Sequence, residues 1–325
     1  RNSSGDKVFE ERYEYTEDLT QHLTYKEAVG STIFQPWINC EVIQPKRKVQ
    51  TWYYPNADKV DSVFTSTAYD YNKIGQNIRT DFIDAYRTRY SDFYQYVTDL
   101  NVADRSPVEN AMISDHVLNL PLKRSRTLNR LIPGDQSELL LSENRYIYSV
   151  VAGNDGSEMI RLAQMKTAKI EYNQSAMISP EYETVETYDV YDLGGRILQT
   201  TDKAGLPTTY IWGHGGLFLV AKIVNCTVDQ AAKISGISTF RTSPFSGDLP
   251  DNIRTLLYNH SSDGNYKVTV YSYQPFWGIS RIMDFAGRSS YFQYNDDGKL
   301  ISVKDDQGNL VQEYEYHTVS DEDEL

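Results

Sequence analysis

The stretch YDLGGRILQTTDKAGLPTTYIW, from Tyr191 to Trp212, decides the fold, because two later stretches follow the same pattern. The second is YQPFWGISRIMDFAGRSSYFQ (residues 273–293), and the third is YNDDGKLISVKDDQGNLVQEYEY (residues 294–316). Each stretch has an Asp eleven residues after its leading Tyr and a Gly three residues after that Asp. A pattern that recurs at fixed spacing predicts one structural unit repeated along the chain.

The third copy shows what such a unit would be. Ile301 and Val303 alternate with polar neighbours, as in a β-strand with two different faces. Residues 295–298 and 305–308 each begin with Asn or Asp and end with Gly, which is typical of a tight hairpin turn. Each copy therefore predicts two strands and two turns, and successive copies extend one twisted antiparallel sheet.

The residues that we expect to shape these hairpins are the repeated Tyr, Asp, Gly and Arg side chains. They are Tyr191, Asp192, Gly195, Arg196, Asp202, Gly205, Tyr210, Asp284, Gly287, Tyr294, Gly298, Asp305, Gly308, Tyr314 and Tyr316. Residues 68–75 (AYDYNKIG) read as a degenerate copy.

This pattern resembles the YD repeat of the Rhs family, which includes bacterial Rhs proteins, toxin-complex shell components and the animal teneurins. The family pattern runs Y-D-x-x-G-R-L, then D-x-x-G, then a strand rich in Thr and Tyr, and residues 191–210 match it closely. The amino-acid sequence of the repeats is especially similar to that of Rhs-like surface proteins of Bacteroidetes. The resemblance implies a mainly β scaffold, coiling into a shell where copies are numerous, that is secreted or exposed outside the bacterial outer membrane.

Two family properties are not implied here. The clear copies are too few to close a shell, so we expect at most a partial one. Self-cleavage in many Rhs cores depends on an Asp-Pro motif, and no Asp-Pro pair occurs in this sequence. The sequence also shows no toxin domain after His317, so encapsulation cannot be carried over from the family either.

Short helices are expected in two places. Ser106-Pro107-Val108-Glu109 has the form of a capping box with Pro at the first helical position, which predicts a helix near 106–116. A second helical region is predicted within 227–260, where it interrupts the repeats and is expected to cover an edge of the sheet. Residues 78–100 fit either a helix or strands, and the Tyr and Thr content favours strands.

These elements suggest three regions along the chain. Residues 1–186 form a β-rich region with degenerate repeats and a short helix, residues 187–317 hold the repeats with their helical insertion, and residues 318–325 are an acidic tail. Cys40 and Cys226 are the only cysteines, and two free, partly buried thiols are favoured over a disulfide between them.

The net charge and the apolar content of the chain limit the classes of partner that we expect. The 325-residue chain has a net charge of −13, which disfavours nucleic acid and anionic membrane surfaces. No segment approaches the ~18 apolar residues of a transmembrane helix. A protein or glycan ligand at the cell surface is the expected partner, while the oligomeric state is left open.

No catalytic site stands out, so we expect no enzyme activity, no cofactor and no metal. His214-Gly215-Gly216 has the composition of an oxyanion loop, but it lacks a G-x-S-x-G nucleophile sequence and is better read as a turn. The acidic turn pairs lack the spacing of a calcium loop. Trp212 and Trp277 are candidates for stacking on a ligand, although braces of the sheet are the commoner role for such rings.

Three functions follow from the sequence. The first is a non-catalytic extracellular scaffold of the Rhs type, as a fragment or a relative of a shell-forming protein. The alternative is a cell-surface protein that binds carbohydrate through exposed Tyr and Trp rings. A glycan-active enzyme is the least favoured of the three.

Overall fold

The computed structural model describes residues 9–15, 20–24, 27–29, 32–34, 37–41, 44–56, 59–130, 138–153, 156–170, 172–173, 176–177, 181–234, 236–262 and 266–316. Over these residues the chain is mainly β, as the repeats predicted, and seventeen strands belong to one antiparallel sheet. The acidic tail, 318–325, lies outside the described residues.

The chain forms two compact units. The first comprises Arg1–Tyr148 and Met165–Thr184, and the second comprises Ser149–Gln164 and Val185–Leu325. The expected coiling into a partial shell concerns both units together and stays a prediction.

Strands of the first unit pair antiparallel with their neighbours in the chain from β6 to β10, and β1 pairs with β6. Its strands are β1 (Phe9–Tyr15), β2 (Thr20–Thr24), β3 (Glu27–Val29), β4 (Thr32–Phe34), β5 (Trp37–Glu41), β6 (Pro45–Asn56), β7 (Lys59–Tyr71), β8 (Asn77–Ile83), β9 (Thr88–Tyr96), β10 (Pro121–Arg130), β13 (Tyr172–Asn173) and β14 (Ala176–Met177). Three strands contribute residues to both units: β11 (Leu139–Ala152), β12 (Glu158–Lys169) and β15 (Glu181–Tyr191).

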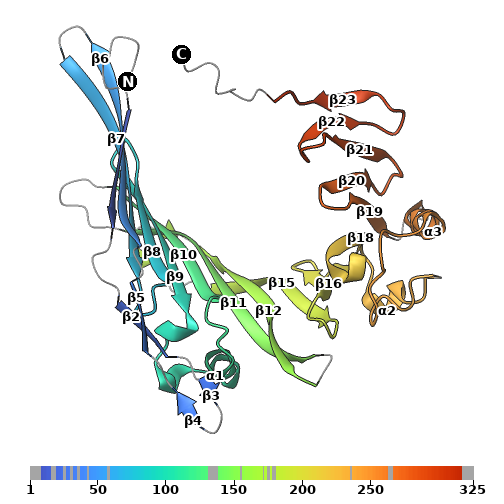
Figure 1. Ribbon diagram of the computed structural model, residues 1–325, viewed down its shortest axis with the longest axis horizontal. Coiled ribbons are helices and arrows are strands. Elements are labelled where there is room, and N and C mark those ends of the chain that lie inside the picture. The colour runs from blue at the N-terminus through green and yellow to red at the C-terminus, as the bar shows by residue number, and fades with distance from the viewer. Residues whose placement is uncertain are drawn as a thin grey trace. The chain divides into compact units, whose positions relative to one another are not determined.

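Strands of the second unit follow the same rule, each pairing antiparallel with the next from β15 to β23. They are β16 (Ile197–Asp202), β17 (Pro207–Gly213), β18 (Phe218–Val224), β19 (Lys267–Gln274), β20 (Gly278–Met283), β21 (Ser289–Tyr294), β22 (Leu300–Lys304) and β23 (Leu310–Glu313), drawn from yellow to red in Figure 1.

The ambiguous stretch 78–100 is strand, as favoured from its composition. It contains most of β8, all of β9 and a short 3-10 helix, η1 (Val97–Asp99). Strands β8 and β9 pair antiparallel, from Arg79↔Phe93 to Ile83↔Arg89.

The predicted helical regions are confirmed. In α1 (Pro107–Ser114), Ser106 Oγ accepts a hydrogen bond from the Glu109 amide, and Glu109 Oε2 accepts one from the Ser106 amide. In α2 (Val228–Ala231), Thr227 and Gln230 make the same reciprocal pair. The remaining helical elements are α3 (Asp251–Ser262), η2 (Val102–Asp104) and η3 (His214–Gly216).

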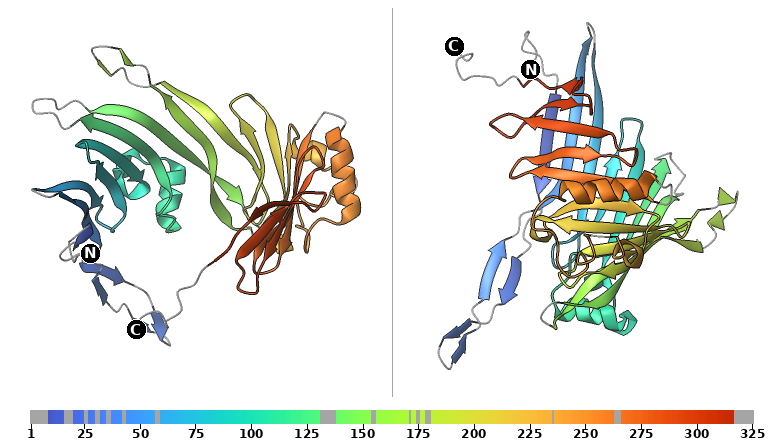
Figure 2. Two further views of the ribbon diagram at one scale, coloured as in Figure 1. Left: turned by 90° about the horizontal axis from the view of Figure 1, so that it is seen from above. Right: turned by 90° about the vertical axis from the view of Figure 1, so that its right-hand side faces the viewer.

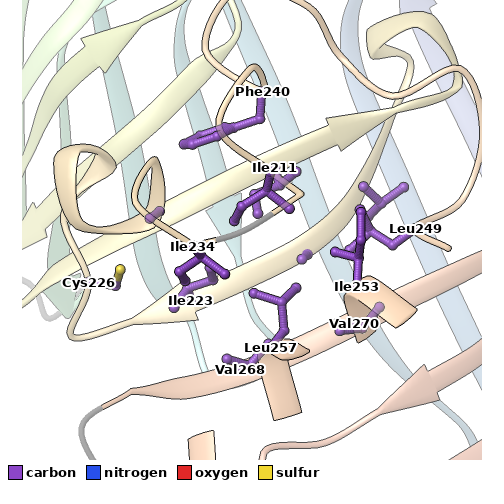
Figure 3. Packing of buried hydrophobic residues seen from close by; sticks show 14 of the residues in the cluster. Ile211, Ile223, Cys226, Ile234, Phe240, Leu249, Ile253, Leu257, Val268 and Val270 are labelled. Atoms are coloured by element: carbon purple, nitrogen blue, oxygen red, sulfur yellow. The ribbon is translucent and has the colours of Figure 1, made fainter. Parts of the chain in front are cut away.

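The insertion between β18 and β19 packs on a face of the sheet, so the expectation that it covers an edge is wrong. The strand register sets Ile211, Ala221 and Val270 side by side on that face. Apolar residues of the insertion, among them Ile234, Phe240 and Leu257, are buried against them (Figure 3). The insertion covers a face because it has many apolar side chains to bury. A sheet face offers apolar area to bury them against, whereas a sheet edge offers backbone groups to pair.

Cys226 lies in this core as a free, fully buried thiol. Burial raises its pKa to about 11. The side chain of Cys40 lies outside the described residues.

Candidate functional site

Within the described residues, seven turns share one hydrogen-bond pattern. The main-chain N–H of the leading residue donates to the oxygen four residues later, and its oxygen accepts from the amide three residues later. Its side-chain Oδ1 also accepts from the amides two and four residues later, as Asp284 does from Ala286 and Arg288 at 2.9 Å each. The leading residues are Asn72, Asp84, Asp192, Asp202, Asp284, Asn295 and Asp305.

The repeat glycines occupy the fourth position of these turns. Their backbone is left-handed, with φ from 73° to 81° at Gly298, Gly195, Gly205 and Gly287 and 84° at Gly308. Glycine adopts this conformation at little cost, since it has no Cβ atom to meet the neighbouring carbonyl. The structure therefore places the Asp and Gly of the repeat where a bulged hairpin turn needs them.

One of the seven turns was not predicted from the sequence, because it has no glycine at its fourth position. The turn led by Asp84 has Arg87 at its fourth position, with φ of 60°. Asp84 is the one residue of this turn that fits the sequence pattern of the repeat. Its Oδ1 accepts hydrogen bonds from the amides of Tyr86 and Thr88 at 2.9 and 2.8 Å.

Two turns add an ion pair between the leading Asp and the residue that follows the glycine. Arg196 Nη2 lies 2.6 Å from Asp192 Oδ2, and Arg288 Nη2 lies 2.8 Å from Asp284 Oδ2. Partial desolvation tends to raise the pKa of Asp284, but the hydrogen bonds from Arg288 and the Ala286 amide outweigh it, so the pKa lies below its ordinary value of 3.8.

Aromatic side chains near the ends of strands donate to a main-chain oxygen of the preceding strand in the sheet; we call these contacts aromatic latches. Tyr294 Oη, for example, donates to the Ile279 oxygen at 2.8 Å. The donors and acceptors are Tyr71 to Pro45, Tyr148 to Pro121, Tyr191 to Leu162, Trp212 to Ile197, Tyr273 to Leu219, Tyr294 to Ile279 and Tyr316 to Leu300.

Most latches lie beside an irregularity in the strand pairing. The accepting residue flanks a register shift in six of them, at Pro45, Pro121, Ile197, Leu219, Ile279 and Leu300. Because a bulge removes a carbonyl from the regular ladder, a side-chain donor that reaches such an oxygen saves the cost of leaving it unpaired. This gives the Tyr of the repeat a physical role that the sequence alone did not reveal.

Two other tyrosines of the repeat contact the sheet differently. Tyr210 Oη lies 3.2 Å from Thr200 Oγ1 on the neighbouring strand. Tyr314 donates its main-chain amide to the Ile301 oxygen at 2.9 Å.

Four turn glycines are covered by a large side chain. The guanidinium of Arg161 lies over Gly195 and that of Arg196 lies over Gly216, while the Tyr258 ring lies over Gly287 and the Trp277 ring lies over Gly298. A Cβ atom at Gly195 or Gly216 would collide with the covering arginine. Gly205 and Gly308 have nothing within 4 Å of that position, so their turns are open.

Trp212 and Trp277 are both half-buried and bound to the protein itself. Trp212 Nε1 donates to the Ile197 oxygen at 2.7 Å, and the ring packs against the buried core. Trp277 meets Tyr294 edge-on, with ring centroids 6.4 Å apart. Stacking of these rings on a ligand stays a prediction.

His214 joins the insertion to the sheet, a contact that the sequence did not indicate. Its Nε2 lies 2.8 Å from Asp248 Oδ1, and the same carboxylate accepts from the Tyr273 amide at 3.1 Å. Thus His214-Gly215-Gly216 is a turn, η3, as expected from the missing nucleophile sequence.

Among the residues that the structure describes, no three His, Cys, Asp or Glu side chains gather in a way that could hold a metal ion. Within the same residues, no helix is long and apolar enough to cross a membrane.

Comparison with known proteins gives likenesses in fold only. No family model and no curated protein matches the chain. A TcdB2–TccC3 crystal structure aligns with 95% of this chain at 10% identity and a TM-score of 0.43. A Tc holotoxin pore of Photorhabdus luminescens aligns with 83% at 13% identity and a TM-score of 0.32.

A porin-like protein from Bacteroides uniformis aligns with 83% of this chain, at 10% identity and a TM-score of 0.19. This chain spans 16% of the TcdB2–TccC3 chain and 11% of the holotoxin chain. With TM-scores below 0.5, none of these likenesses carries an argument about activity or partners.

Proposed function

We propose that this chain is a non-catalytic scaffold of the Rhs/YD-repeat type, secreted or at the cell surface, as a fragment or a relative of a shell-forming protein. The observation that carries the proposal is the single hydrogen-bond pattern of the seven turns. The Asp, Gly and Tyr that define the repeat form their hydrogen bonds with the chain itself, mostly with its backbone. Residues that build architecture so consistently favour a structural role over a chemical one.

The last strand of the second unit supports the role of a sheet that other strands can extend. All four residues of β23 are exposed, including Leu310 at 54% and Val311 at 66%. An exposed, partly apolar strand at the end of a run of hairpins is suited to pair with a further strand. A protein partner that supplies such a strand fits this surface.

A chain lengthened by one repeat tests the proposal. We would insert a second copy of residues 295–316 directly after Tyr316 and follow amide hydrogen exchange. The scaffold role predicts that the added residues become protected and that the urea m-value rises, because repeat units add surface buried against their neighbours.

The matched control is the same insertion with Ala in place of the Asp and Gly that correspond to Asp305 and Gly308. This control copy lacks the turn led by Asp305, which joins its two strands, and its amides are expected to exchange as fast as those of an unfolded peptide. If the unaltered copy exchanged equally fast, the repeat would not extend the sheet, and the scaffold proposal would be contradicted.

Carbohydrate binding through exposed Tyr and Trp rings is the alternative. The contacts of Trp212 and Trp277 with the protein itself favour bracing over stacking. A glycan array probed with this chain addresses the alternative directly. Binding that is lost in Trp277→Ala but kept in Trp52→Ala would support it over the purely structural role.

A further inference from the structure

A groove of about 450 Å³ lies beside α3 on the sheet face that the insertion covers. Ile253 and Leu257 of α3 are buried in the core, and α3 contacts β19 (Figure 2, right). The opposite wall belongs to β20 and the following turn, through Arg281, Met283 and Gly287. The groove thus lies between α3 and β20 with the turn that follows it.

Arg281 is the unusual group in this groove. Its Nε and Nη2 donate to Ser289 Oγ at 3.0 and 2.9 Å, and its guanidinium lies 5.4 Å from the centre of the Tyr291 ring. Within the described part of the chain, no carboxylate forms an ion pair with Arg281. An arginine stays charged at any pH that a protein meets, so this half-buried group carries a positive charge that makes no ion pair with a described residue.

Neighbouring arginines differ in this respect. Arg254 Nη2 lies 3.0 Å from Asp251 Oδ1, and its Nε donates to the Leu249 oxygen at 2.9 Å. Arg288 is paired with Asp284. In a chain of net charge −13, carboxylates for pairing are abundant. Of the two arginines that line the groove, Arg281 is therefore the informative one, because it has no ion pair within the described residues.

The rest of the lining fits a small polar molecule. Asp251 and Arg254 also line the groove, but they are paired with each other at 3.0 Å. Tyr258 and Met283 offer apolar surface. The Tyr258 hydroxyl can form hydrogen bonds, and Thr255 Oγ1, which donates to the Asp251 oxygen at 2.9 Å, can accept one. The volume lies within the range of roughly 300–1,000 Å³ that holds small ligands. An arginine with free N–H groups matches the two oxygens of a carboxylate.

We propose that this groove binds a small carboxylate with a hydroxylated body, of the size of a sugar acid. The carboxylate lies against Arg281, and the hydroxyl groups face Thr255 and Tyr258. The proposal does not depend on the scaffold role, because it concerns one side of α3 and leaves the repeat turns and the edge strand aside.

Glucuronate is the probe, and glucose is the uncharged control of similar size. Titrations at constant ionic strength are followed by the NMR signal of the Arg281 Nε–H. Glucuronate is expected to shift this signal saturably, whereas glucose leaves it unchanged. Equal shifts with glucose, or no saturable shift with glucuronate, would overturn the proposal.

Two variants complete the test by calorimetric titration with glucuronate. Arg281→Gln removes the charge in the groove and is expected to weaken binding at least tenfold. Arg288→Gln removes the same charge from a paired arginine outside the groove lining and is expected to bind like the unmodified chain. Equal affinity in both variants would place the binding elsewhere and contradict the assignment, and melting curves verify that both variants are folded.

Discussion

Arg161 holds Gly195 in place: its Nε donates a hydrogen bond of 3.0 Å to the Gly195 oxygen, and its guanidinium occupies the position of the missing Cβ atom. Gly195→Ala should therefore cost more stability than Gly205→Ala. Both glycines have φ near 80°, so each alanine costs about 1 kcal/mol from the left-handed backbone alone. The collision at Gly195 adds about 1 kcal/mol or more.

Urea unfolding of the two variants measures this difference. Gly205 is the matched control, because nothing lies within 4 Å of its Cβ position. Equal losses of unfolding free energy in the two variants would show that Arg161 does not pack against the turn.

Asp192 should be more sensitive to alanine than to asparagine. Asp192→Ala removes the acceptor of the Gly194 and Arg196 amides and leaves the half-buried Arg196 without its carboxylate, at a cost of about 2 kcal/mol. Asp192→Asn keeps the acceptor, as Asn72 and Asn295 do in their turns, and should cost about half as much. Thermal unfolding compares the pair, and a larger loss with asparagine would refute the shared role of Oδ1.

The Tyr294 latch offers a test by removal of one oxygen atom. Tyr294→Phe leaves the Ile279 oxygen without its side-chain donor, and we expect a loss of about 1 kcal/mol in unfolding free energy. Tyr291→Phe is the control, because the Tyr291 ring is more than one-third exposed. A loss in Tyr291→Phe as large as in Tyr294→Phe would mean that the hydroxyl of Tyr294 adds nothing specific.

Asp284 should make the stability of the second unit depend on acid. Because its folded-state pKa lies below the ordinary 3.8, its contribution is present above that pH and is lost as the pH falls through the folded-state value. Asp284→Asn cannot titrate, so the gap in unfolding free energy between the two proteins should shrink on acidification below about pH 4. Urea unfolding at several pH values measures the gap, and a constant gap would contradict the role of the ionised carboxylate.

The turns and the helix caps could be predicted from the sequence because their partners are local. An Asp that bonds amides two and four residues away, such as Asp202, needs only its own segment. The capping box of Ser106 and Glu109 is equally local. The turn at Asp84 was missed because Arg87 stands where glycine was expected, and the Asp side chain evidently suffices to hold the turn.

The latches, the Arg161 contact and the buried core could not be predicted in the same way. Each depends on which strands become neighbours and on which sheet face is covered. In β22, alternation predicts Ile301 and Val303 on the apolar face, yet Ser302 between them is the buried residue. Periodicity separates two faces but does not say which one the rest of the chain covers.

The aromatic latches have a consequence for the order in which the chain can acquire its structure. In all seven, the donor comes later in the sequence than the acceptor, as with Tyr71 and Pro45 or Tyr316 and Leu300. Each latch can close as soon as its own strand has been synthesised, without waiting for any residue that follows. A sheet built in this way can grow in one direction, with each latched strand fastened to finished structure behind it.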